Sequence, residues 1–434
     1  MARFVAALVT TASGVALNVT PGIEHAQLNS GVAAAALSVA SSGARTPVPD
    51  AWSVPTRGRT EAVATQFLSY LNAVSCTSSV FCVAVGYSND AAGHAKTLIE
   101  SWDGRRWTLT KSPNVVTSDY DQLYAVSCRS SISCAAVGRA HDSRSGFQRT
   151  LTESWNGRSW RIAPSFDTST HADNVLDAVS CTQAGACVAV GYAANTKIGV
   201  WRTLVESWNG RAWKDLASSN SSATENNYLL GVSCRSGSAC TATGYHYKNF
   251  LHTLVESWDG HRWSIVTSAN ALTTGDNILY GVSCVSRSVC TAVGSFYVPA
   301  ETTPTNQNLI ESWDGSRWAI TRSPVTSTTE RNTLNGISCV ANRDCVAVGT
   351  YLNAHNGFNQ TLILSDSRSG WTIATSPNVG TTSRGEDNWL NGVYCVSSNY
   401  CIAVGYYTNT KAVSLTLIET WNGHRWTIEN TANP

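Results

Sequence analysis

The sequence has few charged residues and no long hydrophobic run, and each absence excludes a class of protein. Charged side chains make up 14% of the 434 residues, and the two signs balance to a net charge of +1. Proteins that bind nucleic acid or anionic membranes usually carry an excess of basic residues. This chain has no such excess, so we expect neither partner. No apolar run reaches the roughly 20 residues of a transmembrane helix, so we predict no membrane-spanning segment.

The short motifs of common catalytic sites are also absent. The sequence contains no Gly-x-Ser-x-Gly elbow, no His-Glu-x-x-His zinc motif and no phosphate-binding glycine-rich loop that ends in Lys-Ser/Thr. We therefore name no catalytic residue, and we expect no cofactor and no bound metal.

Cysteine is plentiful and regularly spaced. Five residues separate the two members of each pair, a spacing that fits neither a zinc knuckle nor a thioredoxin-like redox pair. One repeated spacing predicts seven local disulfides and therefore an oxidising compartment, and the alternative is buried free thiols. The predicted pairs are Cys76/Cys82, Cys128/Cys134, Cys181/Cys187, Cys234/Cys240, Cys284/Cys290, Cys339/Cys345 and Cys395/Cys401.

The amino-terminal segment is consistent with export. Arg3 precedes one short apolar stretch, and a second, residues 31–37, runs into small residues where a signal peptidase can cut. We expect residues 1–44 to be a signal peptide or leader and the protein to be secreted and extracellular; the alternative is a flexible leader rich in Ala and Ser. We expect residues 45–70 to be a linker that can supply a closing strand at Trp52.

The rest of the chain, residues 71–434, is a sevenfold repeat. The units start near residues 71, 123, 176, 229, 279, 334 and 390, and successive first cysteines lie 50 to 56 residues apart. This period is typical of propeller blades, and no segment of helical period interrupts the short extended runs. Runs such as 83–85 are apolar at successive positions, so both faces of each sheet must be covered. We predict an all-β, seven-bladed β-propeller with four antiparallel strands and one disulfide in every blade.

The third and fourth strands of a unit are expected to meet at an Asp-Gly or Asn-Gly turn. Asp103-Gly104 fits a two-residue type I′ turn with positive φ at both positions, which places Glu100 opposite Trp107. The resulting group of an acid and aromatic rings is either a ligand pocket between blades or a packing device whose glutamate accepts hydrogen bonds from a neighbour. We favour packing because the group recurs, and we expect the weakest interface at unit six, where Leu364 replaces the acid.

The recurring Ser-Trp-Asp-Gly-x-x-Trp segment resembles a shortened Asp-box, the Ser-x-Asp-x-Gly-x-x-Trp hairpin of sialidase-type propellers. Asp103 and Gly104 are adjacent, one residue closer than in that box, so its turn geometry does not carry over. The whole unit is similar to uncharacterised secreted bacterial repeat proteins and, more distantly, to kelch-type propellers. The resemblance implies a propeller over about residues 71–434 and brings no activity, since the arginine cluster and nucleophilic tyrosine of sialidases cannot be placed here.

Binding residues are expected on the variable loops, at the blade ends opposite the disulfide hairpins. Long, uneven loops on a rigid scaffold are where binding usually resides. Their amides, hydroxyls and aromatic rings suit a polar neutral ligand such as a glycan, and the alternative for each residue is a solvated loop. The candidate ligand-binding residues are Trp201, Trp389, Tyr228, Tyr247, Asn388, Asp387 and Asp276.

An asparagine precedes the first cysteine by seven residues in five units. It either rings the mouth of the central channel or, as we favour, ends the incoming loop by local hydrogen bonding. These residues are Asn174, Asn227, Asn277, Asn332 and Asn388.

The resulting functional hypothesis is a secreted, non-catalytic binding module. We expect its ligands to be carbohydrates or cell-envelope components, with an extracellular protein as the next choice of partner. The alternatives are a structural surface protein and a polysaccharide hydrolase or lyase with acids at the channel mouth. The acids available for such an enzyme are Asp119, Asp121, Asp173, Glu225, Asp276 and Asp387.

Overall fold

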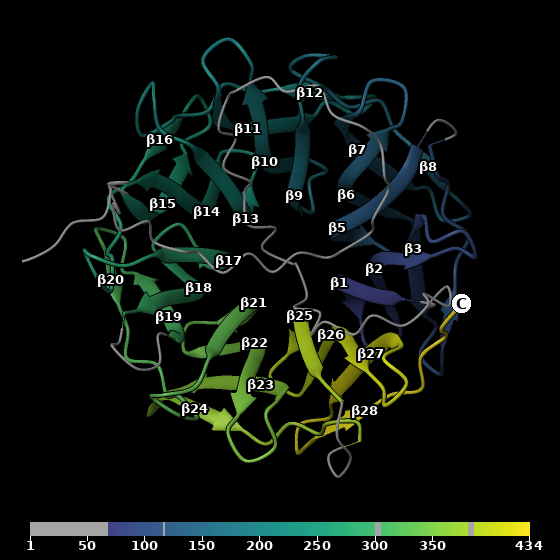
Figure 1. Ribbon diagram of the computed structural model, residues 1–434, viewed down its shortest axis with the longest axis vertical. Helices are drawn as coiled ribbons and strands as arrows, with labels where there is room; N and C mark the ends of the chain where they lie inside the picture. The colour runs from purple at the N-terminus through teal and green to yellow at the C-terminus, as the bar shows by residue number, and fades with distance from the viewer. Residues whose placement is uncertain (1–67, 116–117, 300–304, 381–385) are drawn as a thin grey trace, which may run out of the picture. The chain divides into compact units, whose positions relative to one another are not determined.

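The computed structural model describes residues 68–115, 118–299, 305–380 and 386–434. These residues form seven four-stranded antiparallel sheets, arranged as the blades of a propeller (Figure 1). Each sheet consists of four strands that are consecutive in the sequence. The predicted all-β, seven-bladed fold is therefore confirmed, whereas the expected leader and Trp52 lie outside the described residues.

The strands of each blade have the following bounds. Blade 1 comprises β1 (Ser69–Ser78), β2 (Phe81–Asn89), β3 (Ala95–Trp102) and β4 (Trp107–Leu109). Blade 2 comprises β5 (Ser118–Ser130), β6 (Ser133–Asp142), β7 (Phe147–Trp155) and β8 (Trp160–Ile162). Blade 3 comprises β9 (Asn174–Cys181), β10 (Cys187–Asn195), β11 (Val200–Trp208) and β12 (Trp213–Asp215). Blade 4 comprises β13 (Asn227–Ser236), β14 (Ala239–Lys248), β15 (Phe250–Trp258) and β16 (Trp263–Ile265).

Blade 5 comprises β17 (Asn277–Ser286), β18 (Val289–Val298), β19 (Thr305–Trp313) and β20 (Trp318–Ile320). Blade 6 comprises β21 (Asn332–Ala341), β22 (Asp344–Asn353), β23 (Phe358–Ser367) and β24 (Gly370–Ala374). Blade 7 comprises β25 (Asn388–Ser397), β26 (Tyr400–Thr408), β27 (Ser414–Trp421) and β28 (Trp426–Ile428). The first strand of each blade lies nearest the central axis and the fourth lies at the rim (Figure 1).

Apolar residues of facing sheets form the core between neighbouring blades. Val83, Val85 and Ile99 of blade 1 pack with Leu123 and Leu151 of blade 2, and none of these side chains is more than 1% exposed. Successive residues of the second strand are thus buried on both faces, as the sequence predicts. Burial of this kind is the main force that holds one blade against the next.

All seven predicted disulfides are present, and each joins the first and second strands of its blade. The paired cysteines face each other across the ladder, with Cα atoms 4.0 Å apart in every bridge, and no free cysteine is present among the described residues. Each bridge closes a short hairpin loop at one end of its blade. The bridges are Cys76–Cys82, Cys128–Cys134, Cys181–Cys187, Cys234–Cys240, Cys284–Cys290, Cys339–Cys345 and Cys395–Cys401.

The second cysteine of six bridges also contacts the backbone of its own hairpin, which the cysteine spacing does not predict. Its sulfur lies 3.8 to 4.0 Å from the carbonyl oxygen of the residue four positions earlier, and its side chain is at most 5% exposed. A disulfide sulfur carries no hydrogen to donate, so this is a packing contact rather than a hydrogen bond, and the role of these cysteines is structural. The six residues are Cys82, Cys134, Cys240, Cys290, Cys345 and Cys401.

The predicted register of the third and fourth strands is wrong. Trp102 pairs with Trp107, and their rings lie 5.7 Å apart, so four residues rather than two form the turn. Glu100 consequently pairs with Leu109 and not with Trp107. In six blades two tryptophans therefore lie against each other, with tilted rings, across the end of the hairpin.

A side-chain acceptor explains the longer turn. Gly104 has a φ of +90°, but no positive φ occurs at Asp103. Instead, Asp103 Oδ1 accepts the N–H groups of Arg105 at 2.8 Å and Arg106 at 2.9 Å. Asp and Asn commonly stabilise turns in this way, so the Asp-Gly pair selects a turn closed by the side chain.

A buried glutamate of the third strand connects six of the seven blade interfaces. It accepts a hydrogen bond from the segment that follows the fourth strand of the preceding blade; for example, the Phe166 N–H donates to Glu206 Oε2 at 3.1 Å. The predicted packing role of this acid is therefore confirmed. The corresponding pairs are Ala432–Glu100, Ser112–Glu153, Phe166–Glu206, Ser219–Glu256, Ala269–Glu311 and Ser376–Glu419.

Blade 6 replaces this device with apolar packing. Leu364 occupies the glutamate position, is completely buried and belongs to a cluster with Ile310 and Leu334. Since a buried acid must be desolvated and a leucine need not be, apolar replacement of a buried polar group can be neutral or stabilising. The expected weakness of this interface therefore stays a prediction without a structural reason in its favour.

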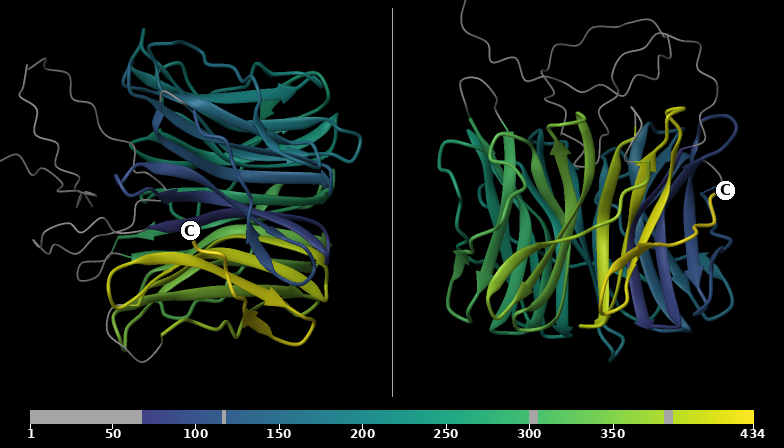
Figure 2. Two further views of the ribbon diagram at one scale, coloured as in Figure 1. Left: turned by 90° about the vertical axis from the view of Figure 1, so that its right-hand side faces the viewer. Right: turned by 90° about the horizontal axis from the view of Figure 1, so that it is seen from below.

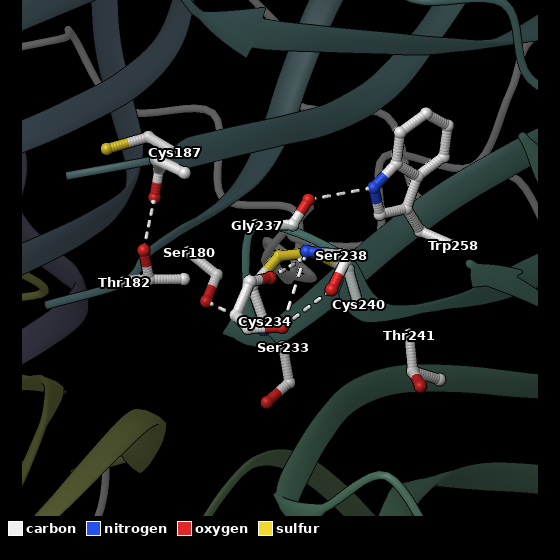
Figure 3. The surroundings of a disulfide bond; sticks show 12 residues. Ser180, Thr182, Cys187, Ser233, Cys234, Gly237, Ser238, Cys240, Thr241 and Trp258 are labelled. Atoms are coloured by element: carbon white, nitrogen blue, oxygen red, sulfur yellow. Dashed lines mark hydrogen bonds between the residues drawn. A yellow bond between two sulfur atoms is a disulfide. The ribbon is translucent and has the colours of Figure 1, made fainter. Parts of the chain in front are cut away.

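In the described part of the chain the ring closes by contact between blades 7 and 1, and no strand is shared between their sheets. Asn391 Nδ2 donates to the Leu71 carbonyl at 2.9 Å, and the Tyr70 hydroxyl donates to Ser414 Oγ at 3.2 Å. At the other six interfaces a serine accepts the N–H of the next blade's first cysteine; Ser180 and Cys234 form one such pair, at 2.9 Å (Figure 3). Tyr394 stands at that serine position in blade 7, so the closing interface lacks this hydrogen bond within the described residues.

Candidate functional site

The strands cross the thickness of the ring, so that each blade presents connections at two opposite ends (Figure 2). We call one end the disulfide face; it carries the disulfide hairpins and the Asp-Gly or Asn-Gly turns. These two connections touch within a blade, because Trp102 Nε1 donates to the Ser79 carbonyl at 3.0 Å. The opposite end, which carries the second-to-third strand loops and the connections between blades, is called the loop face.

Two of the predicted ligand-binding residues belong to an aromatic cluster between blades 3 and 4. Tyr228 is only 3% exposed. Its ring lies 4.7 Å from Tyr245, 4.9 Å from Tyr192 and 6.2 Å from Trp201. Burial raises the pKa of the Tyr228 hydroxyl well above its ordinary value. Contacts of this kind stabilise the interface, so the rings pack the blades together.

Trp389 lies in a matching cluster between blades 7 and 1. Its ring stacks on Tyr406 with centroids 6.0 Å apart, and Tyr406 contacts Tyr70, which stacks on Tyr87. The three tyrosines occupy the same blade positions as those of the first cluster. Trp389 is therefore also engaged in packing.

The predicted polar residues of the loop face hold the loops in place. Asp276 Oδ1 accepts the Leu251 N–H at 2.8 Å, and Asp387 Oδ1 accepts the Asn359 N–H at 2.7 Å. Asn388 is 1% exposed, and its amide both accepts from and donates to the Val379 backbone. The four other asparagines make the same kind of local bond, so the favoured loop-ending role fits all five.

Tyr247 differs from the other predicted residues because it is exposed. It is 49% exposed and lies near the tip of the β14–β15 hairpin, one residue from the Lys248–Phe250 pair. The seven predicted residues are spread over blades 3, 4, 5 and 7, and the structure does not bring them together in one site.

A pocket that the sequence analysis did not predict lies at the disulfide face, between blades 2 and 3. Its volume is about 240 Å³, and we call it the blade 2–3 pocket. Aromatic rings, small residues and a single cation make up its wall. The lining residues are Arg129, Ser133, Cys134, Ala135, Ser154, Trp155, Cys181, Gly185, Cys187, Trp208, Gly210 and Trp213.

The pocket coincides with an exception in the pattern of tryptophan hydrogen bonds. In five blades the first tryptophan of the Asp-Gly or Asn-Gly turn donates its indole N–H to a carbonyl of the disulfide hairpin. Figure 3 shows this bond in blade 4, where Trp258 Nε1 lies 3.0 Å from the Gly237 oxygen. The indole N–H of Trp208 in blade 3 has no such partner among the described residues. The five donors are Trp102, Trp155, Trp258, Trp313 and Trp421.

The disulfide hairpin of blade 3 explains the exception. In blade 4, Ser236 Oγ accepts the Ser238 N–H at 3.3 Å, which turns the Gly237 carbonyl toward the tryptophan. Blade 3 has Gln183 at the serine position. There the Gly185 backbone has a φ of +92° and its N–H donates to the Thr182 carbonyl at 2.9 Å, so the hairpin takes another course.

Arg129 forms the edge of the pocket on the blade 2 side. Its Nε donates to Ser133 Oγ at 2.8 Å, which fixes the plane of the guanidinium. A Cβ atom at Gly185 would lie 3.0 Å from Arg129 Nη1, so the arginine reaches across to blade 3 and glycine leaves room for it. The pocket thus combines flat apolar rings with hydrogen-bond donors, an arrangement suited to a small ligand rich in oxygen acceptors.

Each acid proposed for a hydrolase or lyase has a hydrogen-bond or ion-pair partner, and for Asp121 this is the Val115 N–H at 2.9 Å. Asp173 accepts the Gln148 N–H at 2.8 Å, as Asp276 and Asp387 do in their blades. Asp119 contacts His141 at 2.6 Å, and Glu225 contacts His246 at 3.2 Å. Within the described ranges, no group of three or more His, Cys, Asp or Glu side chains is placed to hold a metal ion.

In the same part of the chain, no helix has the length and apolar character needed to cross a membrane.

Comparisons with known proteins give matches among solved structures at low sequence identity. No protein-family model matches the sequence, and no curated protein matches it either. Among solved structures, an ulvan lyase of a polysaccharide lyase family matches with a TM-score of 0.52 at 6% identity, over 84% of this chain and 96% of that chain.

Two further structures widen the comparison. The xyloglucanase of Xanthomonas campestris matches with a TM-score of 0.50 at 12% identity, over 86% of this chain and 56% of that chain. The fucose-recognising lectin of Aleuria aurantia, described as a six-bladed propeller, matches with a TM-score of 0.41 at 13% identity, over 70% of this chain and 95% of that chain. At these identities the likeness establishes that this chain shares the β-propeller architecture.

Proposed function

We propose that this protein is a secreted, non-catalytic module that binds carbohydrate, and that the blade 2–3 pocket is its binding site. One observation carries the proposal. The equivalent tryptophan of five other blades donates its indole N–H to the disulfide hairpin, whereas Trp208 makes no such bond within the described residues and lines a pocket walled by tryptophans. Seven disulfides support an oxidising, extracellular location.

The lining of the pocket supports a sugar ring as ligand. A sugar has apolar C–H faces that can lie on tryptophan and hydroxyl groups that accept N–H donors, and the pocket supplies both kinds of surface. Its volume of about 240 Å³ is below the roughly 300–1,000 Å³ of pockets that enclose drug-sized ligands, so it suits one ring of a glycan. The ulvan lyase and the xyloglucanase share only the fold with this chain, so the pocket and not the likeness carries the proposal.

The experiment compares matched tryptophan variants. Trp208→Phe keeps an aromatic ring but removes the free N–H. For glycans that bind the natural protein, we expect this variant to weaken the binding free energy by about 1 kcal/mol, which is roughly fivefold in affinity. The control is Trp258→Phe, whose N–H is occupied by Gly237 in blade 4. A glycan array followed by titration calorimetry provides the measurement.

A loop exchange tests the origin of the pocket. Replacing residues 182–186 of blade 3 with residues 235–239 of blade 4 keeps the loop length and restores a serine at the turn. We expect the new hairpin to offer its carbonyl to Trp208 and to abolish glycan binding while the melting temperature is retained. Binding that survives both this exchange and Trp208→Phe would place the glycan elsewhere, with the loop face as the next surface to test.

A further inference from the structure

We infer that the blade 2–3 pocket selects a sugar that carries an anionic group, either a carboxylate or a sulfate ester. This inference rests on the proposed function and narrows its ligand class. Arg129 is the only charged residue among those that line the pocket. A polar neutral sugar, the ligand type suggested by the sequence, would leave this cation without a counter-charge.

The guanidinium of Arg129 is available to a ligand. Among the described residues it makes no ion pair, and its hydrogen bond to Ser133 Oγ, at 2.8 Å, uses Nε alone. Arg149 of the same blade is different, because it contacts Asp142 at 3.6 Å and Asp167 at 3.4 Å. With its plane fixed by Ser133, Arg129 offers the remaining N–H groups in a geometry that matches two oxygens of one anion.

The turns beside the pocket also lack acids. Blades 1, 4 and 5 have aspartate at the first turn position, and in blades 4 and 5 this acid lies 3.9 and 3.8 Å from the arginine three residues later. Blades 2 and 3, which form the pocket, have the neutral Asn156 and Asn209 instead. Their turns keep the cations Arg158 and Arg211, so these two turns carry only positive charge although the whole chain has a net charge of only +1.

The experiment measures the affinity of the full chain for matched pairs of neutral and anionic sugars. Methyl glucoside is compared with methyl glucuronide, and methyl galactoside with its 6-sulfate, by calorimetry in low and high salt. We expect the anionic member to bind at least tenfold more tightly at low salt, and this ratio to shrink in 0.5 M NaCl because salt screens an exposed charge. The first pair tests the effect of a carboxylate on affinity, and the second pair tests the effect of a sulfate ester.

Arginine variants assign the preference to one residue. Arg129→Gln should reduce the anionic-to-neutral ratio to near one, whereas Arg129→Lys should keep part of it, because an ammonium supplies charge without the planar fork. The matched control, Arg235→Gln at the equivalent position of blade 4, should leave the ratio unchanged.

The possible results separate this inference from the proposed function. Equal affinity for neutral and anionic sugars, with binding still dependent on Trp208, would overturn the inference and leave glycan binding intact. An anionic preference that survives Arg129→Gln would overturn the role of Arg129. Binding of free acetate or sulfate as tight as that of the anionic sugars would replace the sugar site with a bare anion site, and binding of no sugar at all would overturn both proposals.

Discussion

The interface glutamates are buried acids that have no cation beside them. Each is 0% exposed, and desolvation raises the pKa to about 8 in Glu153, Glu206, Glu256 and Glu419 and to about 7 in Glu311. In four of them one carboxyl oxygen has no hydrogen-bond partner among the described residues: Glu100, Glu206, Glu256 and Glu311. The folded propeller therefore holds Glu153, Glu206, Glu256 and Glu419 mainly in the protonated form at pH 7.

This protonation predicts a pH dependence of stability. The unfolded chain releases these protons near the ordinary pKa of 4.5, whereas folded Glu206 holds its proton up to about pH 8. The folded state thus binds more protons between these values, so the contribution of Glu206 to the free energy of unfolding is highest below about pH 4.5 and declines as the pH rises to 8. Further carboxyl groups of the surface act in the opposite direction, so the test must isolate one interface.

The isolating variant is Glu206→Gln, which is neutral at every pH and keeps an oxygen acceptor for the Phe166 N–H. We expect the melting temperature of this variant, relative to the natural protein, to be higher at pH 8.5 than at pH 5. Calorimetry at the two pH values provides the measurement, with Glu429→Gln at the rim as control. An equal difference at both values would show that Glu206 is ionised in the folded state already at pH 5.

At the scale of the strand hairpin, the disulfide adds local stability to a blade that other contacts already hold. Closing so short a loop removes unfolded-state entropy worth about 2 kcal/mol by the chain-entropy model. We expect Cys234→Ala/Cys240→Ala in blade 4 to lower the free energy of unfolding by about this amount and to leave the fold intact, as measured by guanidinium titration. A double variant that fails to fold would instead show that the hairpin is needed to form the blade.

Strand-level features were predictable from the sequence because they repeat. Seven cysteine pairs and successive apolar residues specify the hairpins and the two-sided burial without knowledge of any partner. The turn was misjudged because Asp103 acts through its side chain, and the Asp-Gly pair alone does not show whether a backbone or a side-chain group closes the turn.

The candidate site could not be predicted in the same way. Tyr228 and Trp201 look like free loop residues, yet their partners include rings on a neighbouring blade, which the ring arrangement brings close. The blade 2–3 pocket arises from an exception to the repeat, with Gln183 and Gly185 in the hairpin. A comparison of the seven hairpins, unit by unit, contains that signal, whereas a search for shared features hides it.

At the scale of the whole molecule, the interface between blades 7 and 1 differs from the other six in how its blades are connected. Consecutive blades are joined by the chain, whereas within the described residues blades 7 and 1 are joined by contacts alone, and Tyr394 replaces the serine that bridges each of the others. Opening this interface breaks one set of contacts and displaces no connecting segment of the described residues. We therefore expect unfolding to begin there.

Two asparagines make this expectation testable. Asn391 Nδ2 donates to the Leu71 carbonyl across the closing interface, and Asn335 Nδ2 donates to the Leu390 carbonyl across an ordinary one, both at 2.9 Å. Asn391→Ala and Asn335→Ala should each lower the free energy of unfolding by about 1 kcal/mol, the usual contribution of one internal hydrogen bond. Their effects on unfolding kinetics should differ.

If the closing interface is already open in the transition state, Asn391→Ala destabilises only the native ring and speeds unfolding by the full equilibrium effect, about fivefold for 1 kcal/mol. Asn335→Ala weakens an interface that is still formed at that stage, so its unfolding rate should rise less than twofold while its refolding slows. Stopped-flow unfolding in guanidinium measures both rates. Equal acceleration by the two variants would mean that the ring opens without preference, and the lack of a shared strand would then have no kinetic consequence.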